Sequence, residues 1–429
     1  MSQRQYCLPD LLRDWPWIRD ISPYYPKAKK ESSEWVTSFH PFDTRGQRRF
    51  DACDLNLLAS LTYSRRSEEF VRAGCDLMNF YFVYDEYTDV SDPKVARELA
   101  NIVTNVMKNP EDEYSTKYST NNTHLLGDMT RQFWKRATAL AKPGSPCFKH
   151  FIDTSEAYLL AVTREAEDRA NHTVRSVEDY LHLRRDTCGA RPTLALIEFG
   201  LNLSEDVTSN PVVASLREAA VDLIILVNDM HSYTREISCG LASHNIITPI
   251  MRDYNLDLQS ALEWLGTYTD GVVSKFLSNL TQVPSFDDQD LEERLWTYVD
   301  GLGQWVRGND DWSCEGKRYY GDDGLIIKKT RLISVEPRWG NYLRLQEMAS
   351  SGEETPSPAL ITDPIEVPAQ AKEDGMSEAK DPGSGFSSPT LPLRDFVLQM
   401  EVRTWWSWII DGVMVKSALM RLPPWKIQN

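Results

Sequence analysis

The sequence lacks the features of membrane proteins and of disulfide-stabilised proteins. It has no uncharged apolar run of about 18 residues, the length that a membrane-spanning helix requires. The N-terminal stretch MSQRQYCLPDLLRDWPW has no apolar core of a signal peptide. The seven cysteines are scattered, odd in number and without a CxxC pair, so we expect neither a disulfide framework nor a zinc site. These absences favour a reducing compartment, and we predict a cytoplasmic protein without a transmembrane segment.

Positive charge is also scarce. Lys and Arg number 47 against 63 Asp and Glu, which gives a net charge of −16. Nucleic acid is a poor partner for such a chain, because its binding rests on cationic contacts to phosphate. An anionic small molecule would need local arginines or metal ions. The sequence also offers no convincing Ser-His-Asp or Cys-His pattern for nucleophilic catalysis.

Few segments show the strict alternation of β-strands, whereas helical spacing recurs from about residue 48 to 345. In the stretch 259–280 the apolar side chains fall at helical intervals. Apolar residues make up 41% of the chain, enough for a sizeable core. We therefore predict an all-α protein, a single helical bundle around an apolar cavity. Residues 1–40, rich in Pro and aromatics, are predicted to form an irregular arm that wraps this body.

The composition changes near residue 350, and we predict three segments. Residues 1–345 form the helical domain. Residues 346–393 form a disordered linker, because seven prolines lie between Ser351 and Leu393 among Gly, Ser and Glu. Residues 394–429 form an apolar helical extension, which could dock on the body, on a membrane surface or on a partner. This extension is either an added module or the product of an unspliced intron in the gene model.

The first candidate site follows the apolar run Phe80–Tyr84, which leads directly into Asp85, Glu86 and Asp89. Asp85 and Asp89 are four residues apart and share one helix face, where like charges repel unless a cation neutralises them. Carboxylates at this spacing suit Mg²⁺. The alternative is an exposed acidic helix end, and Glu86 and Asp89 could instead pair with a nearby arginine.

A second candidate site follows another apolar run, Leu223–Val227. Asn228, Ser232 and Glu236 lie at i, i+4 and i+8 and therefore face one way on a helix. An amide oxygen, a hydroxyl and a carboxylate on one stripe form a plausible Mg²⁺ site. Two buried helices that each end in oxygen ligands indicate one cavity with metal at its mouth.

These two motifs resemble those of a known family. DEYTD is similar to the D(D/E)xxD motif of class I terpene synthases, and NDMHSYTRE is similar to their (N/D)Dxx(S/T)xxxE motif. The resemblance covers about residues 10–345 and is greatest to basidiomycete fungal sesquiterpene synthases of the protoilludene-synthase-like group. It implies a class I α fold, three Mg²⁺ ions, farnesyl diphosphate as substrate and terpene cyclase activity. Within that group it also implies 1,11-ring closure through a humulyl cation to a tricyclic hydrocarbon such as Δ6-protoilludene.

The resemblance further implies a set of diphosphate-binding residues. The family has a diphosphate-sensing arginine some 40 residues before the second motif, and Arg184 stands 44 residues before Asn228, with Arg185 as the alternative. Arg235 matches a basic position beside Glu236, and Arg318 with Tyr319 matches a late Arg-Tyr pair. A planar, permanently charged guanidinium suits diphosphate. Taken singly, each arginine could equally be a surface or ion-paired residue.

The reaction that follows is ionisation of the diphosphate ester and cyclisation of the allyl cation away from water. Asp85 and Arg184 are the predicted catalytic residues at the mouth. Phe82 and Trp312 match wall positions of the family, where aromatic faces stabilise carbocations, although core packing is the alternative for each. A chain-elongating prenyl diphosphate synthase and a catalytically silent helical scaffold are the competing functions. The sequence leaves the oligomeric state open.

Overall fold

The computed structural model describes residues 4–111, 121–171 and 173–335, without the side chains of 121–124. The predicted linker, 346–393, and the predicted extension, 394–429, lie outside the described residues. These two segments and their boundary with the helical domain therefore stay predictions.

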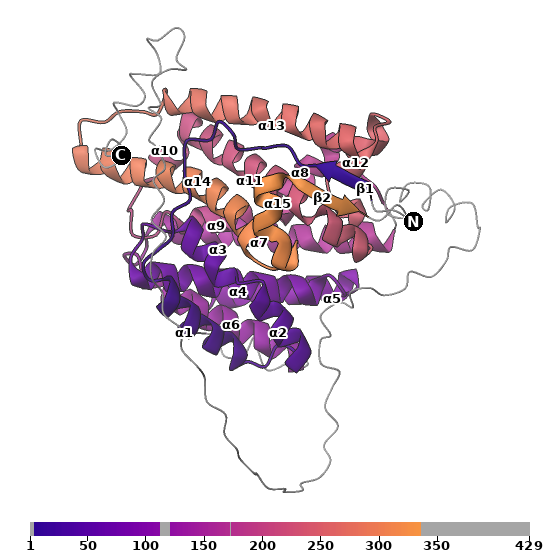
Figure 1. Ribbon diagram of the computed structural model, residues 1–429. Helices are drawn as coiled ribbons and strands as arrows, with labels where there is room; N and C mark the ends of the chain where they lie inside the picture. The colour runs from indigo at the N-terminus through magenta and orange to yellow at the C-terminus, as the bar shows by residue number, and fades with distance from the viewer. Residues whose placement is uncertain (1–3, 112–120, 172, 336–429) are drawn as a thin grey trace, which may run out of the picture. The chain divides into compact units, whose positions relative to one another are not determined.

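Helices make up almost all of the regular secondary structure in the described part of the chain, which confirms the all-α prediction (Figure 1). Its longer helices are α1 (Tyr25–Thr37), α2 (Thr44–Ala52), α3 (Leu55–Thr62), α4 (Glu68–Thr88), α5 (Pro93–Lys108), α6 (Asn121–Thr138), α7 (Pro146–Ala170), α8 (Val177–Thr187), α11 (Pro211–Ser238), α13 (Leu258–Leu280) and α14 (Gln289–Glu315). Its shorter elements are α9 (Ala190–Leu196), α10 (Glu205–Thr208), η2 (Ala242–His244), α12 (Ile247–Asp253), η3 (Gly321–Asp323), α15 (Gly324–Thr330) and the strands β1 (Arg4–Cys7) and β2 (Leu332–Val335). The predicted helix 259–280 corresponds to α13. No helix within the described ranges is long and apolar enough to cross a membrane.

Helix α4 carries the first motif through the interior. Its N-terminus is capped by Ser67, whose hydroxyl accepts from the Phe70 amide, and Glu68 and Glu69 in the first turn complement the helix dipole. The run Phe80–Tyr84 is buried apart from Phe82, which is partly exposed. Neighbours pack on several faces of α4, namely α1, α3 and α6. The last turn of α4, which begins with Asp85, therefore directly follows a buried stretch of the same helix.

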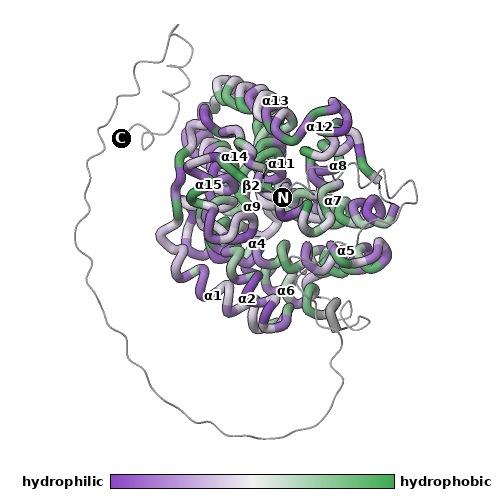
Figure 2. The backbone as a smooth tube through the Cα atoms, turned by 45° about the vertical axis from the view of Figure 1, so that its right-hand side comes forward, coloured by the Kyte–Doolittle hydropathy of each residue, from purple (hydrophilic) through white to green (hydrophobic). Residues whose placement is uncertain are grey.

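Helix α11 does the same for the second motif. Asn210 caps its N-terminus by accepting from the Val212 amide, and Pro211 occupies the first helical position, where no amide hydrogen is needed. Residues Leu223–Val227 are all buried. Helix α11 packs against α13 and α14, α14 packs against α3, and α3 packs against α4. Figure 2 shows hydrophobic and hydrophilic residues mixed along these helices, as expected when each buries one face.

The N-terminal arm was predicted to be irregular, and this prediction is wrong in part. Arg4–Cys7 pairs antiparallel with Leu332–Val335, and Tyr25–Thr37 is helical. Pro26 is compatible with this helix, because it stands in the first turn, where proline is tolerated. Between these elements the arm packs on α14 through Trp15 and Trp17, which are 4% and 3% exposed.

The close approach of the arm to α14 depends on a glycine. The Trp17 indole donates to the Asp300 carboxylate at 2.8 Å and lies so close to Gly303 that a Cβ there would meet the ring at 2.1 Å. A side chain larger than hydrogen at this position would therefore displace the arm.

Candidate active site

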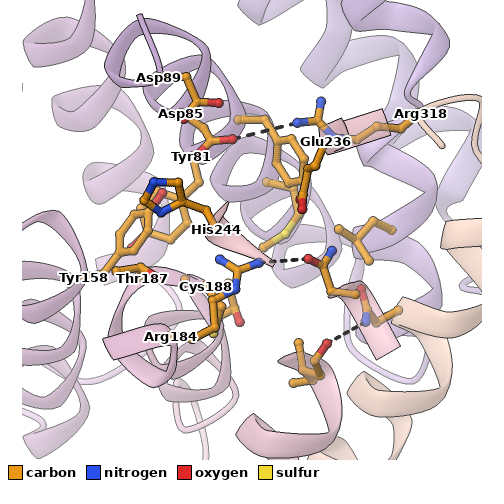
Figure 3. A pocket seen from close by; sticks show the side chains of 18 of the residues that line it. Tyr81, Asp85, Asp89, Tyr158, Arg184, Thr187, Cys188, Glu236, His244 and Arg318 are labelled. Atoms are coloured by element: carbon orange, nitrogen blue, oxygen red, sulfur yellow. Dashed lines mark hydrogen bonds and ion pairs between the residues drawn. The ribbon is translucent and has the colours of Figure 1, made fainter. Parts of the chain in front are cut away.

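A cavity of about 160 Å³ lies between the ends of the two motif helices. It is lined by residues of α3, α4, α7, α8, α9, α11 and α14, and by the loops that follow α11 and α14. Aromatic and apolar side chains such as Met78, Ile224 and Trp305 line part of it, and charged side chains line the rest. Figure 3 shows Asp85 and Asp89 at one side of this cavity, with Arg184, Glu236 and Arg318 facing them.

Within the first motif, Asp85 and Asp89 line the cavity and Glu86 does not. Asp85 retains 39% side-chain exposure toward the cavity and lies 3.8 Å from Arg318 Nη2. Asp89 lies 3.7 Å from Arg169 Nη1. Glu86 is 8% exposed and accepts from Arg318 Nη1 at 3.3 Å, with Arg235 Nη2 at 3.7 Å. The motif therefore splits into two cavity-facing carboxylates and one that binds arginines.

The two cavity-facing carboxylates are poorly neutralised. Burial raises the pKa of Asp85, and Glu86 raises it further against the opposing charge of Arg318. Burial and then the neighbouring Asp85 carboxylate raise the pKa of Asp89 well above its usual range. Desolvation and like-charge repulsion both disfavour the ionised pair. This end of α4 is thus a place where an added cation would be stabilised.

Within the second motif, Asn228 and Glu236 line the cavity, whereas Ser232 is buried behind them. Asn245, which follows η2, donates to the Ser232 hydroxyl at 3.2 Å and to Glu236 Oε2 at 2.8 Å. Burial raises the pKa of Glu236 to about 7, and the charge of Asp229 adds to this. The predicted i, i+4, i+8 stripe is therefore held together by an amide that sequence spacing did not indicate.

The structure separates the two candidate sensor arginines, because consecutive helical residues point about 100° apart. Arg184 lines the cavity and donates through Nη2 to Asn228 Oδ1 at 2.9 Å and to Asp229 Oδ1 at 3.1 Å. Arg185 instead forms a two-pronged ion pair with Asp222, at 2.6 and 3.1 Å. Helix α8 then ends before Gly189, whose φ of +68° favours glycine and turns the chain along the cavity into α9.

Arg318 and Tyr319 lie on the loop between α14 and η3 and connect the two motifs. Arg318 contacts Asp85 and Glu86 on α4, while the Tyr319 hydroxyl accepts from Asn228 Nδ2 on α11 at 2.9 Å. Together with Arg235 and Arg184, these side chains place three guanidinium groups at the cavity wall.

The predicted wall aromatics, Phe82 and Trp312, also line the cavity. Their rings meet edge to face with centroids 5.8 Å apart, and the Arg318 guanidinium lies 4.7 Å from the Phe82 ring centre. The Trp312 indole donates to the Cys53 carbonyl at 2.8 Å, which fixes its orientation. Both rings are thus packed against neighbours and open to the cavity.

Sequence reasoning missed several side chains of this cavity. Glu165, Arg169 and Tyr158 come from α7, where Tyr158 packs on Tyr81 of the first motif's apolar run with ring centroids 5.0 Å apart, and His244 is the last residue of η2. Burial lowers the pKa of His244 to about 4. The residues on α7 and η2 do not belong to either motif, so only the packing of these two elements around the cavity reveals them. The one available signal was the presence of acidic and basic residues within the apolar pattern of α7.

The candidate metal ligands come from two separate helices and not from one cluster of side chains. Within the residues that the structure describes, no three His, Cys, Asp or Glu side chains lie close enough together to hold a metal ion. The oxygens come instead from two separate helices, and the second motif contributes an amide and a hydroxyl beside its single carboxylate.

Comparison with known proteins accounts for this arrangement. Residues 76–275 match the family model described as terpene synthase family 2, C-terminal metal binding. The chain is also 61% identical over 348 residues to the sesquiterpene synthase Agr8 of Cyclocybe aegerita, which covers 81% of this chain and 96% of that protein. The chain belongs to the terpene synthase family.

Other terpene synthases support the assignment. The chain is 39% identical over 336 residues to a Δ6-protoilludene synthase of Stereum hirsutum, which covers 78% of this chain and 89% of that protein. It is similar in fold to the linalool/nerolidol synthase of Streptomyces clavuligerus, with a TM-score of 0.60 at 20% identity over 71% of this chain and 99% of that one. The sequence-based assignment to terpene synthases is thereby confirmed, and the family implies a divalent metal and a prenyl diphosphate.

Proposed function

We propose that this terpene synthase is a sesquiterpene synthase that ionises and cyclises farnesyl diphosphate with Mg²⁺, releasing diphosphate. One observation carries the proposal. Asp85 and Asp89 on α4, Asn228 and Glu236 on α11, and Arg184 on α8 all line the same cavity. Oxygen ligands and guanidinium groups therefore surround the space where a diphosphate head would lie, and apolar and aromatic walls surround the rest.

The residues present fit a divalent cation. Carboxylate and amide oxygens are the ligands that Mg²⁺ prefers, and it usually completes its shell with water and substrate phosphate. Burial raises the pKa values of Asp85, Asp89 and Glu236 despite the neighbouring arginines, so an added cation would stabilise their ionised forms. We propose that Asp85 and Asp89 would hold Mg²⁺ at one side of the cavity, and that Asn228, Ser232 and Glu236 would hold Mg²⁺ at the other side. Three ions in all are expected, as in the family.

Bound Mg²⁺ supplies Lewis-acid stabilisation of the charge that develops on the leaving diphosphate. The chain's own contribution is cationic and directional. Arg184, Arg235 and Arg318 each present a planar set of donors to phosphate oxygens, and the Tyr319 hydroxyl adds one more. Because these groups are fixed by neighbours before the substrate arrives, little reorganisation is needed when charge moves to the diphosphate.

The walls then control the cation. Phe82 and Trp312 line the cavity, and an aromatic face stabilises a positive charge through its quadrupole. Tyr81 and Tyr158 extend this lining. Exclusion of water by such walls directs the cation to ring closure and proton loss instead of hydration. Relatives named Δ6-protoilludene synthases favour 1,11-closure through a humulyl cation to a tricyclic hydrocarbon.

The test is product analysis. Purified protein is incubated with farnesyl diphosphate and Mg²⁺, and volatiles are identified by gas chromatography and mass spectrometry. A cyclic C15 hydrocarbon is expected, and it disappears when a chelator removes the metal. A longer prenyl diphosphate made with added isopentenyl diphosphate would instead identify a prenyl diphosphate synthase. If no product forms from farnesyl, geranyl or geranylgeranyl diphosphate, the cyclase proposal is wrong and a catalytically silent helical scaffold is favoured.

A further inference from the structure

His231 is a buried side chain of α11 that neither motif nor the proposed chemistry uses. It stands next to Ser232 and is 1% exposed. Its Nε2 lies 3.0 Å from Asp310 Oδ1 on α14, and its Nδ1 lies 2.9 Å from the Tyr320 hydroxyl. A fully buried imidazole with a partner on each nitrogen is held in one orientation.

The direction of these hydrogen bonds follows from their partners. Asp310 is also in contact with Arg307, whose Nη1 lies 3.2 Å from Asp310 Oδ2, so its carboxylate accepts on both oxygens. The imidazole Nε2 therefore donates to Asp310, and in the neutral ring Nδ1 then accepts from the Tyr320 hydroxyl. Tyr320 is thereby anchored to α11 through a histidine that is itself fixed by a carboxylate.

Tyr320 follows Arg318 and Tyr319 on the loop that connects the two motifs. Two side-chain contacts tie this loop to α11, from Asn228 to Tyr319 and from His231 to Tyr320. At its other side, Arg318 reaches Asp85 and Glu86 on α4. A loop that must present Arg318 and Tyr319 to a diphosphate needs such anchors, because each freely moving residue adds ordering entropy to binding.

We propose that His231 is a positioning residue for diphosphate binding: with Asp310 behind it, it fixes Tyr320 and so holds Arg318 and Tyr319 against the cavity. This inference rests on the proposed function, because it assigns Arg318 and Tyr319 to the diphosphate. The same contacts extend to the N-terminal arm, since Arg307 donates to the carbonyls of Trp17 and Leu12 at 2.8 and 3.1 Å. The arm is therefore part of the support of this loop.

The experiment measures binding of inorganic diphosphate in the presence of Mg²⁺ by titration calorimetry, on the full chain. The variants are Tyr320→Phe, His231→Leu and their combination. His150→Leu is the matched control, because His150 also pairs with a carboxylate, Glu198, at 2.8 Å but does not line the cavity. KM and kcat for farnesyl diphosphate are measured on the same proteins.

Loss of one anchoring hydrogen bond predicts diphosphate binding weakened about 5- to 10-fold in Tyr320→Phe and in His231→Leu. The combined variant is expected to be no weaker than His231→Leu alone, since both changes break one connection. KM should rise more than kcat falls, and His150→Leu should bind as the unchanged protein does.

Unchanged binding in Tyr320→Phe, or an equal loss in His150→Leu, would overturn the proposal. Tyr320→Phe decides the matter if His231→Leu does not fold, because it removes only a hydroxyl. A failure of the proposed function is distinguishable, since a silent scaffold would bind no diphosphate even as the unchanged protein, and product analysis of the unchanged protein identifies a prenyl diphosphate synthase.

Discussion

Arg184 Nη2 donates to Asn228 Oδ1 at 2.9 Å, so the predicted diphosphate sensor rests on a predicted metal ligand. Asp229, fully buried, accepts from the same guanidinium and from the Tyr180 hydroxyl at 2.5 Å. Arg184 and the polar side chains of the second motif therefore satisfy one another's hydrogen-bonding groups. A diphosphate that takes Arg184 as a donor would release the Asn228 oxygen, which couples substrate binding to metal binding.

Arg184 and Arg185 allow a matched test of this arrangement. Arg184→Lys keeps the charge but loses the planar fork, so kcat/KM for farnesyl diphosphate should fall about 10- to 100-fold. Arg185→Lys makes the same chemical change at the ion pair with Asp222 and should stay within about twofold. Steady-state release of diphosphate gives both values. A larger loss in Arg185→Lys would assign the sensor role to Arg185.

Asp85 offers a second test, because its activity and stability effects should have opposite signs. Asp85→Asn removes a cavity carboxylate that we expect to bind Mg²⁺, so turnover should fall at least about 100-fold. It also removes a buried charge whose pKa is raised by desolvation, so the ligand-free protein should melt at a higher temperature near neutral pH. Product release and thermal unfolding are measured on the same preparations.

The surface substitution Asp153→Asn serves as the control for Asp85, since Asp153 is 52% exposed and pairs with Lys149. It should leave both turnover and melting temperature near their original values. Full turnover in Asp85→Asn would exclude Asp85 from the metal site, and a lower melting temperature would show a structural role instead.

The parts of this site that could be predicted from sequence are those that depend on the spacing of residues within one helix. The run Phe80–Tyr84 before Asp85, and Leu223–Val227 before Asn228, each placed candidate oxygen ligands after a buried run, in the C-terminal part of a helix. The fourfold spacing within each motif then set which residues share a face. These features depend only on helix geometry and hydrophobicity, which act along the chain.

What could not be predicted depends on contacts between distant segments. The spacing of DEYTD left open whether Glu86 binds metal or pairs with an arginine, and it could not indicate that the partner is Arg318, 232 residues away. Likewise Asn245 joins Ser232 to Glu236 from outside the motif. Helix α1 was missed because Pro23 and Pro26 suggested irregular structure, whereas proline fits a first helical turn.

The wall aromatics predict effects on the product. Phe82→Leu should keep the fold but shift the product mixture toward acyclic or monocyclic hydrocarbons, because a cation-stabilising ring is lost. Trp312→Leu should do the same and also destabilise the protein by about 3 kcal/mol, since Trp312 is 1% exposed and its indole donates to Cys53. Product profiles and urea denaturation measure the two effects.

Phe151→Leu provides the comparison for these two variants. Phe151 is fully buried on α7 but does not line the cavity, so it should lose stability without changing the product. An altered product from Phe151→Leu would mean that general loosening of the core redirects the cation, and the wall role of Phe82 and Trp312 would then lack support.

The predicted domain boundary can be tested by truncation after residue 345. Among the described residues, those that line the cavity lie between Leu58 and Tyr319, so the truncated chain should keep kcat/KM within about twofold if 346–429 is a linker and an added segment. Circular dichroism establishes that the shorter chain is folded. Loss of turnover in a folded truncated protein would show that the C-terminal residues contribute to the cavity.

Glu236 gives a prediction for pH. Burial and the charge of Asp229 raise the pKa of Glu236 to about 7, whereas an unfolded chain titrates near about 4.3. The folded protein therefore holds a proton that the unfolded chain has released, and the stabilisation from Glu236, complete below about pH 4.3, is lost as pH rises to about 7. Gln cannot ionise, so Glu236→Gln should gain up to about 3 kcal/mol relative to the unchanged protein across this range. Urea denaturation with a chelator present measures the difference, and Glu293→Gln, at an exposed position of α14, provides the matched substitution. A stability difference that does not change with pH would contradict the raised pKa of Glu236.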